Sequence, residues 1–143
     1  MLSTGGRASK DPEARAAPVR LAPEIASITT GSTNLPGIIY ENSPPFIEFL
    51  AGVFKENGVK PEIEVFEAGM VSNGLFLAKK DYFELPMHFN FVMGAPGAIP
   101  ATVKNLLFLS ESIPANCTWS VAGLGPREIP LATAAVVMGG HAR

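Results

Sequence analysis

Short β-type runs alternate with helix-type runs along this chain, and that alternation constrains the fold more than any other feature. Six segments are predicted as strands: residues 1–3, 24–30, 60–69, 87–94, 118–123 and 141–143. Five helices are predicted between them: residues 12–17, 44–57, 70–80, 102–112 and 127–138. Such βα units build parallel sheets. The sheet is either doubly wound or curved into a barrel, and periodicity alone does not choose between the two.

Capping residues mark where three of these helices begin. Asp11 precedes Pro12, Ser43 precedes two prolines, and Thr102 precedes the apolar run "VKNLLFL". Ser, Thr and Asp are favoured N-caps, and proline is favoured in the first helical turn. We therefore predict N-caps at these three positions, and a loop over residues 31–42.

The predicted strands share a second property, which is a polar face opposite an apolar one. Residues two apart lie on the same face of a strand. The apolar faces carry Ala26 with Ile28, Ile63 with Val65, Phe89 with Phe91, and Trp119 with Val121. The polar faces carry Ser27 with Thr29, Glu64, His88 with Asn90, Ser120, and His141 with Arg143.

Ordinary buried parallel strands are apolar on both faces, because helices cover both. A polar face on five strands therefore favours a barrel, with apolar faces toward outer helices and polar faces toward a shared lumen. An unpaired buried Glu64 or Arg143 would cost several kcal/mol. We expect these two side chains to pair with each other or with a ligand.

Composition excludes several classes of protein. The chain has 143 residues, enough for a single domain, with 11 Lys and Arg against 13 Asp and Glu. No basic run is present, so nucleic acid is not an expected partner. No apolar stretch is long enough to cross a membrane, and no signal peptide is apparent, so we expect a cytoplasmic protein. Cys117 is the only cysteine of the chain, so an internal disulfide is excluded. Its position in a predicted loop favours no catalytic role over a nucleophilic one.

Loops that follow the predicted strands are candidates for a binding site. "STGG" at residues 3–6 offers hydroxyls and glycine N–H groups to an anion, and a small carboxylate is the best fit. It matches neither GxxxxGK[ST] nor GxGxxG. "GAPGAIPAT" at residues 94–102 either arches over a pocket or serves as a turn before the helix. His88 is more simply a hydrogen-bonded lumen residue than a metal ligand.

A series of motifs resembles one known family over essentially the whole chain. The motifs are "STGG", "PEIASITTGSTN", "YENSP", "KPEIEVFEAGM", "HFNFVMGAPG", "NLLFL", "TWSVAGLG" and "GGHAR", and their order and spacing resemble the β-keto acid cleavage enzymes. The resemblance implies a zinc-dependent (β/α)8 barrel. It implies exchange of the acyl group of a β-keto acid with acetyl-CoA, which gives acetoacetate and a new acyl-CoA. We expect residues 1–143 to form one incomplete TIM-barrel domain, from about the third strand to the eighth, that is a homo-oligomer when complete.

The resemblance assigns the substrate carboxylate to two places in this sequence. Ser3, Gly5 and Gly6 match the family turn that holds it. The strand end "SITT" matches a second contact, for which we favour Thr29, with Ser27 on the same face as the alternative.

The resemblance also assigns two catalytic residues. Glu64 matches a lumen glutamate that orients its neighbours, and Arg143 matches an arginine suited to a developing oxyanion or to the carboxylate. His88 and His141 do not match the zinc ligands, so we expect those ligands, and a catalytic Asp, to lie outside this chain. The chain is therefore expected to be an inactive fragment in isolation.

Two other functions stay open. A barrel aldolase or lyase with a Schiff base would need a lysine in the lumen, whereas Lys55, Lys60, Lys79, Lys80 and Lys104 lie at predicted helix ends or turns. A non-catalytic domain that keeps only the carboxylate cradle is the second alternative.

Overall fold

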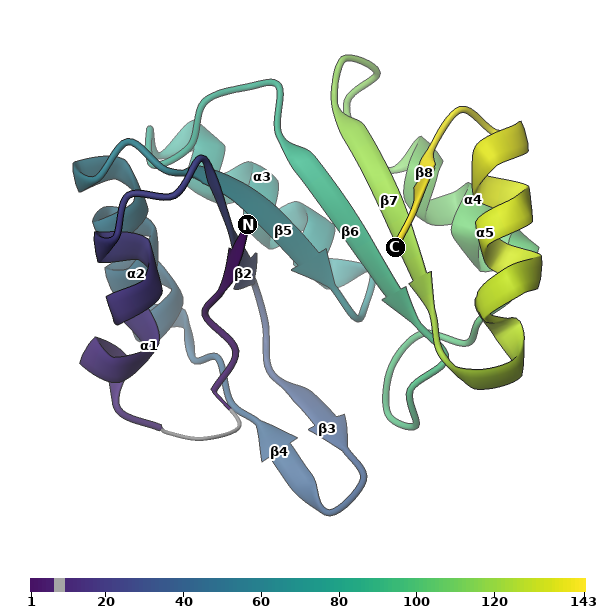
Figure 1. The fold of residues 1–143 in the computed structure, drawn as a ribbon, viewed down its shortest axis with the longest axis horizontal. Coiled ribbons are helices and arrows are strands. Elements are labelled where there is room, and N and C mark those ends of the chain that lie inside the picture. Colours follow the sequence, from purple (N-terminus) through teal and green to yellow (C-terminus); the bar gives the residue numbers. More distant parts are fainter. Residues whose placement is uncertain (7–9) are drawn as a thin grey trace.

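A computed structural model describes residues 1–6 and 10–143, and its centre is a six-stranded parallel sheet (Figure 1). The strands run in the order β1 (Leu2–Ser3), β2 (Ile25–Thr29), β5 (Lys60–Val65), β6 (His88–Met93), β7 (Thr118–Gly123) and β8 (His141–Ala142). Each new strand is added on the same side of the previous one, whereas a doubly wound sheet reverses direction. The expected fold class, α/β with a partial TIM barrel, is confirmed.

Five helices connect these strands, and they begin and end within three residues of the predicted positions. They are α1 (Pro12–Arg20), α2 (Pro44–Glu56), α3 (Gly69–Lys79), α4 (Val103–Glu111) and α5 (Glu128–Val137), with a short 3-10 turn η1 (Gly125–Arg127) before α5. In Figure 1, α1 and α2 lie at one end of the sheet, α3 lies behind its middle, and α4 and α5 lie at the other end.

Two of the three predicted N-caps are confirmed. The Asp11 carboxylate accepts a hydrogen bond from the Glu13 N–H at 3.2 Å, and the Thr102 hydroxyl accepts one from the Asn105 N–H at 3.2 Å. Ser43 occupies the N-cap position of α2, but its side chain makes no capping hydrogen bond. Such a bond normally comes from the second or third helical N–H, and the second helical residue here is a proline without one.

The loop predicted over residues 31–42 is wrong in part, because an antiparallel hairpin forms within it. Strand β3 (Thr33–Leu35) pairs with β4 (Ile38–Tyr40). Pro36 and Gly37 make the turn, and Gly37 has a φ of 74°. Proline followed by a positive-φ glycine is typical of a type II turn. The hairpin follows β2 directly, and it therefore projects from the carboxyl end of the sheet, at the bottom of Figure 1.

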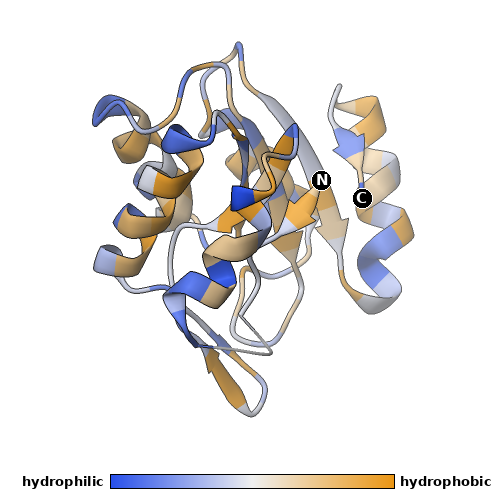
Figure 2. Ribbon diagram, turned by 60° about the vertical axis from the view of Figure 1, so that its left-hand side comes forward, coloured by the Kyte–Doolittle hydropathy of each residue, from blue (hydrophilic) through white to orange (hydrophobic). Residues whose placement is uncertain are grey.

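The apolar faces of the strands form the main core, as predicted. Ile28, Ile63, Phe89 and Trp119 stand side by side in register, and all four are buried. The helices cover this face with their own apolar residues, which include Leu50, Phe54, Leu106 and Leu131. In Figure 2, hydrophobic stretches of the strands lie beside hydrophobic stretches of the helices. Because burial of each large aliphatic side chain stabilises the fold by about 1.5–3 kcal/mol, this layer fixes which face of each strand points away from the helices.

Two further expectations can be compared with the structure. Cys117 is buried and carries a free thiol. Within residues 1–6 and 10–143, none of the helices combines the length and the apolar character that a bilayer crossing requires.

Candidate active site

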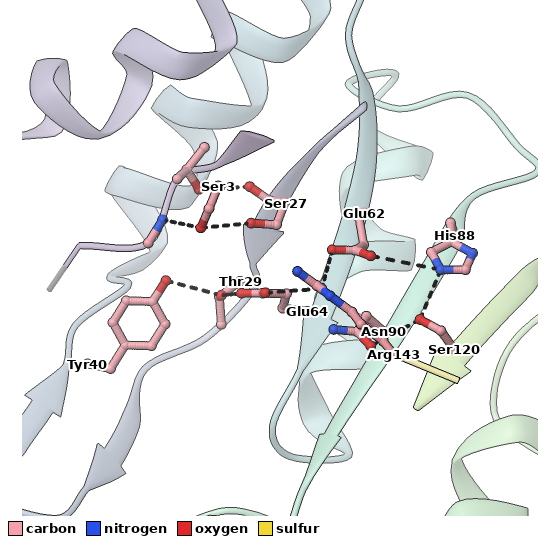
Figure 3. Close-up of polar contacts among 12 residues, drawn as sticks. Ser3, Ser27, Thr29, Tyr40, Glu62, Glu64, His88, Asn90, Ser120 and Arg143 are labelled. Atoms are coloured by element: carbon pink, nitrogen blue, oxygen red, sulfur yellow. Dashed lines mark hydrogen bonds and ion pairs between the residues drawn. The ribbon is translucent and has the colours of Figure 1, made fainter. Parts of the chain in front are cut away.

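The polar faces of the strands form two rows across the sheet, because parallel strands place partner residues side by side. One row contains Ser3, Ser27, Glu62, His88 and Thr118. The next row toward the carboxyl end contains Thr29, Glu64, Asn90, Ser120 and His141. Every member predicted to face a common interior does so, and Figure 3 labels ten residues of this face and its surroundings. The polar lumen inferred from strand alternation is therefore confirmed.

An ion-pair cluster lies at the centre of these rows. Arg143 Nη1 donates to Glu62 Oε2 at 2.6 Å and lies 3.6 Å from Glu64 Oε1 (Figure 3). The expected pairing of Glu64 with Arg143 is present, but the shorter contact is to Glu62. Sequence analysis missed Glu62, although it lies two residues before Glu64 and so shares its face. Burial raises the pKa of Glu62 above its usual value, and the Arg143 charge acts in the opposite direction.

His88 lies beside this cluster in a chain of neutral hydrogen bonds. Ser120 Oγ donates to Asn90 Oδ1 at 3.0 Å, so its oxygen accepts from His88 Nε2 at 3.1 Å. His88 Nδ1 then accepts from Thr118 Oγ1 at 2.9 Å. Burial lowers the pKa of His88, and the charges of His141 and Arg143 add to this effect. His88 is thus a hydrogen-bonded residue of the lumen face.

The turn after β1 leaves one hydroxyl proton free for a ligand. Ser3 Oγ accepts from the Gly5 N–H at 3.1 Å and from Ser27 Oγ at 3.4 Å. Among the described residues nothing accepts the Ser3 proton, which can therefore be donated to an anion. Thr4 Oγ1 donates to the Ser27 carbonyl at 2.8 Å and ties the turn to β2.

Thr29 is connected to both the hairpin and the ion-pair cluster. Its hydroxyl donates to Glu64 Oε2 at 2.9 Å, so its oxygen accepts from the Tyr40 hydroxyl at 3.3 Å. Thr29 is buried and orients Glu64 in this arrangement. Tyr40 could not be identified from the sequence, because its segment was interpreted as a loop.

A pocket of about 1030 Å³ opens at the carboxyl end of the sheet. Of the predicted site residues, Ser3, Gly5, Gly6 and Glu64 line it, whereas Ser27, Thr29 and Arg143 contact lining residues from behind. The other side of the pocket is apolar and includes Leu35, Ile38, Ile39, Phe66, Val92, Ala95, Pro96 and Leu124. The 94–102 loop was predicted either to cover a pocket or to form a turn before a helix, and it does both. It contributes Ala95 and Pro96 to the pocket, and its Thr102 caps α4.

Lys10, which sequence analysis did not consider, stands at the mouth of the pocket. Its Nζ lies 3.9 Å from Glu41 Oε2, and the side chain is 81% exposed. A lysine that forms a Schiff base is normally activated by burial in an apolar site or by a neighbouring cation. Exposure beside a carboxylate is the opposite environment, so Lys10 does not favour the aldolase alternative.

A zinc ion needs three or four donor side chains around one point. In the described ranges 1–6 and 10–143, no group of three or more His, Cys, Asp and Glu side chains is arranged to hold a metal. The carboxylate nearest His88 belongs to Glu62, which is engaged by Arg143. The residues present do not fit a zinc site.

Comparisons with known proteins agree with one another. The family described as beta-keto acid cleavage enzyme matches residues 1–143. The chain is 43% identical over 142 residues to a 3-keto-5-aminohexanoate cleavage enzyme of Acetoanaerobium sticklandii, with 99% of this chain and 52% of that protein covered. It is 33% identical over 145 residues to a 3-oxoadipate:acetyl-CoA acetyltransferase of Cupriavidus necator, with 99% and 51% covered. The chain spans about half the length of the curated relatives that it matches.

Solved structures share the fold at lower sequence identity. The apo structure of ObcA aligns with a TM-score of 0.81 and 20% identity over 98% of this chain and 39% of that chain. A binary complex of ObcA with oxaloacetate aligns with a TM-score of 0.65 and 21% identity over 84% and 34%. These likenesses bear on the fold alone.

Proposed function

Because the chain belongs to the beta-keto acid cleavage enzyme family, we propose that it forms part of the active site of an acyl-exchanging enzyme. The reaction is R–CO–CH2–COO⁻ plus acetyl-CoA giving acetoacetate plus R–CO–CoA. The bond between the acyl carbon and CH2 breaks, and the acetyl group forms the equivalent bond with that CH2. Acetyl-CoA loses its acetyl–sulfur bond and the sulfur takes the R–CO group, so atoms and charge balance.

The main observation behind this proposal is that an anion-binding turn and a carboxylate side chain line the same pocket. Ser3, Gly5 and Gly6 line the same space as Glu64. In the proposed complex, the carboxylate of the β-keto acid lies against the turn and accepts a hydrogen bond from the Ser3 hydroxyl. A hydrogen bond to a charged group contributes about 1.5–3 kcal/mol. The apolar side of the pocket then receives the R group.

Glu64 and Arg143 act on the reacting end of the substrate in this proposal. Thr29 donates to Glu64 and holds the carboxylate group in one orientation. Arg143 is held by Glu62 and keeps a fixed positive charge beside the lumen, where it stabilises negative charge that develops on the substrate oxygen. Ser27 acts through Ser3, to which it donates a hydrogen bond.

The resemblance also implies zinc, homo-oligomers and acetyl-CoA as co-substrate. Zinc would require ligands other than the described residues, and no step above passes through it. Acetyl-CoA as co-substrate is supported by the name of the Cupriavidus necator relative, an acetyl-CoA acetyltransferase.

Because the 143-residue chain by itself is expected to be inactive, acyl exchange is tested with a hybrid in which this chain replaces the matching residues of the Acetoanaerobium sticklandii relative. The hybrid is incubated with acetyl-CoA and a panel of β-keto acids, with and without added Zn²⁺. Mass spectrometry should detect acetoacetate and the matching acyl-CoA. Ser3→Ala should lower kcat/KM roughly tenfold through the loss of one charged hydrogen bond. Ser110→Ala on α4 is the matched control, because the Ser110 hydroxyl donates only to the Leu107 carbonyl of its own helix. Absence of acyl-CoA for every keto acid in both buffers would refute the proposal.

A further inference from the structure

Arg15 is a buried cation in the wall of the pocket. It lies on α1 and is only 7% exposed. Its Nε donates to the Thr4 carbonyl at 3.0 Å, Nη1 to the Glu41 carbonyl at 2.9 Å, and Nη2 to Asn42 Oδ1 at 2.6 Å. All of these acceptors are neutral, and within the described part of the chain no carboxylate pairs with the guanidinium. A buried charge without a counter-charge is costly.

The guanidinium joins the two segments that border the polar end of the pocket. One is the turn at residues 3–6, contacted through Thr4. The other is the end of the β3–β4 hairpin, contacted through Glu41 and Asn42. The Phe46 ring stacks under the guanidinium, with Cζ 4.1 Å from the ring centroid. A side chain at Gly6 would collide with the Arg15 guanidinium, so the fit against the turn is tight.

The same arginine begins a directed hydrogen-bond chain. Nη2 lies 3.5 Å from the Tyr40 hydroxyl, to which it donates. Tyr40 donates to Thr29, and Thr29 donates to Glu64. Because each hydroxyl has a single proton, the direction of every link follows from the last one, where a carboxylate can only accept. Arg15 fits the start of this donor order, because a guanidinium can only donate.

We propose that Arg15 is a positioning residue for the substrate carboxylate, because it holds the turn to the hairpin and places an unpaired positive charge behind the cradle. The inference rests on the proposed function, which assigns a carboxylate to that turn. The ligand then supplies the counter-charge that the buried guanidinium lacks. Arginine is required for the full effect, since only its planar fork can donate to three acceptors on two segments while it stacks on Phe46.

The test compares a charged ligand with a neutral one of similar shape. Binding of acetoacetate and of its methyl ester is measured by calorimetry for the wild-type protein, Arg15→Met and Arg15→Lys. Arg20→Met, on the same helix but exposed, is the control. Arg15→Met should weaken acetoacetate binding roughly tenfold or more while leaving methyl acetoacetate within about twofold. Arg15→Lys keeps the charge and should recover part of the acetoacetate affinity.

A structural role alone predicts a different result. Equal loss of both ligands in Arg15→Met, or no recovery in Arg15→Lys, would overturn the inference. If Arg15→Met does not fold, the comparison of Arg15→Lys with wild type decides it, because acetoacetate should weaken more than the ester. Binding of acetoacetate by the wild-type chain, together with no acyl exchange by the hybrid described above, would refute the proposed function and leave the inference standing. Wild-type protein that does not bind acetoacetate would overturn both.

Discussion

Glu62 and Glu64 face one guanidinium, and their environments differ. Glu62 is buried and makes the short contact to Arg143, whereas Glu64 lines the pocket. Because burial raises the pKa of Glu62, the folded state binds its proton more tightly than the unfolded chain does. The stabilisation from this group is fully present below the unfolded pKa of about 4.5 and is lost as pH rises through the raised value.

Replacement of Glu62 by Gln should therefore remove a downward contribution from the pH dependence of the free energy of unfolding. In wild-type protein, Glu62 contributes a decrease in the free energy of unfolding as pH rises above about 4.5, and Gln cannot titrate. The lowered pKa of His88 contributes a slope of the opposite sign in both proteins. Urea unfolding between pH 4.5 and 7 measures the difference, with exposed Glu111→Gln as the control. Parallel profiles for wild type and Glu62→Gln would contradict the prediction.

Thr33 offers a second residue-scale prediction. Its hydroxyl is buried and has no hydrogen-bond partner in the part of the chain that the structure describes. Removal of an unsatisfied buried hydroxyl without a change of shape should stabilise the fold by about 1 kcal/mol, and valine also suits a strand. Thr33→Val should thus raise the urea midpoint, with exposed Thr133→Val as the control. A lower midpoint would show that the hydroxyl has a partner in solution.

Single residues also show where sequence reasoning about the site ends. Glu64 and Arg143 were identified together with their pairing, because alternation places them on one face and buried charges need partners. The same alternation could have identified Glu62, which lies two residues before Glu64. Arg15 and Tyr40 could not be identified from the sequence. Their contacts depend on how α1 and the β3–β4 hairpin pack against the turn at residues 3–6, and no local sequence pattern predicts that packing. The roles assigned to the predicted site residues stay predictions; these residues are Ser3, Gly5, Gly6, Ser27, Thr29, Glu64 and Arg143.

At the scale of elements, the six strands and five helices of the barrel were predictable, but the β3–β4 hairpin was not. Strands and helices that bury one side carry a period of two or of about 3.6 residues. The hairpin strands are three residues each, too short for a period, and Ile38 and Ile39 are both largely exposed. The remaining signal was Pro36-Gly37 between apolar residues, which indicates a turn and thereby a hairpin.

The hairpin is supported by the 94–102 loop through one glycine. Gly97 has a φ of 86°, and a side chain there would overlap the Asn34 carbonyl of β3. Gly97→Ala should destabilise the protein by more than about 2 kcal/mol, from the left-handed conformation and the displaced backbone together. Gly58→Ala, with a φ of 62° and nothing within 4 Å, should cost only about 1–2 kcal/mol. Equal urea midpoints for the two variants would show that loop and hairpin are not in contact.

At the scale of the whole molecule, the sheet has two edges, β1 and β8. Strand order decides between barrel and doubly wound arrangements, and it depends on crossovers that no segment encodes alone. The barrel was nevertheless predicted, because a polar face on strand after strand favours a sheet that helices cover on one side only.

The two edges lead to a prediction for the 143-residue chain expressed by itself. Unpaired backbone groups on an edge strand promote association. Sedimentation should show concentration-dependent association, and a charged residue on each edge, Leu2→Lys with Ala142→Lys, should reduce it. Leu21→Lys, exposed beyond the end of α1, should not. A monodisperse wild-type monomer with a sharp unfolding transition would contradict this prediction.

The rows of paired polar residues across the sheet limit where a related sequence can gain or lose a residue. One residue inserted between Glu62 and Glu64 would place their two carboxylates on opposite faces of β5, so that one of them would point into the helix layer. A similar insertion in the connection at residues 113–117 would leave every row intact. Gaps between related sequences should therefore fall in the connections, and a single gap inside a strand would signal that the chemistry of the pocket has been lost.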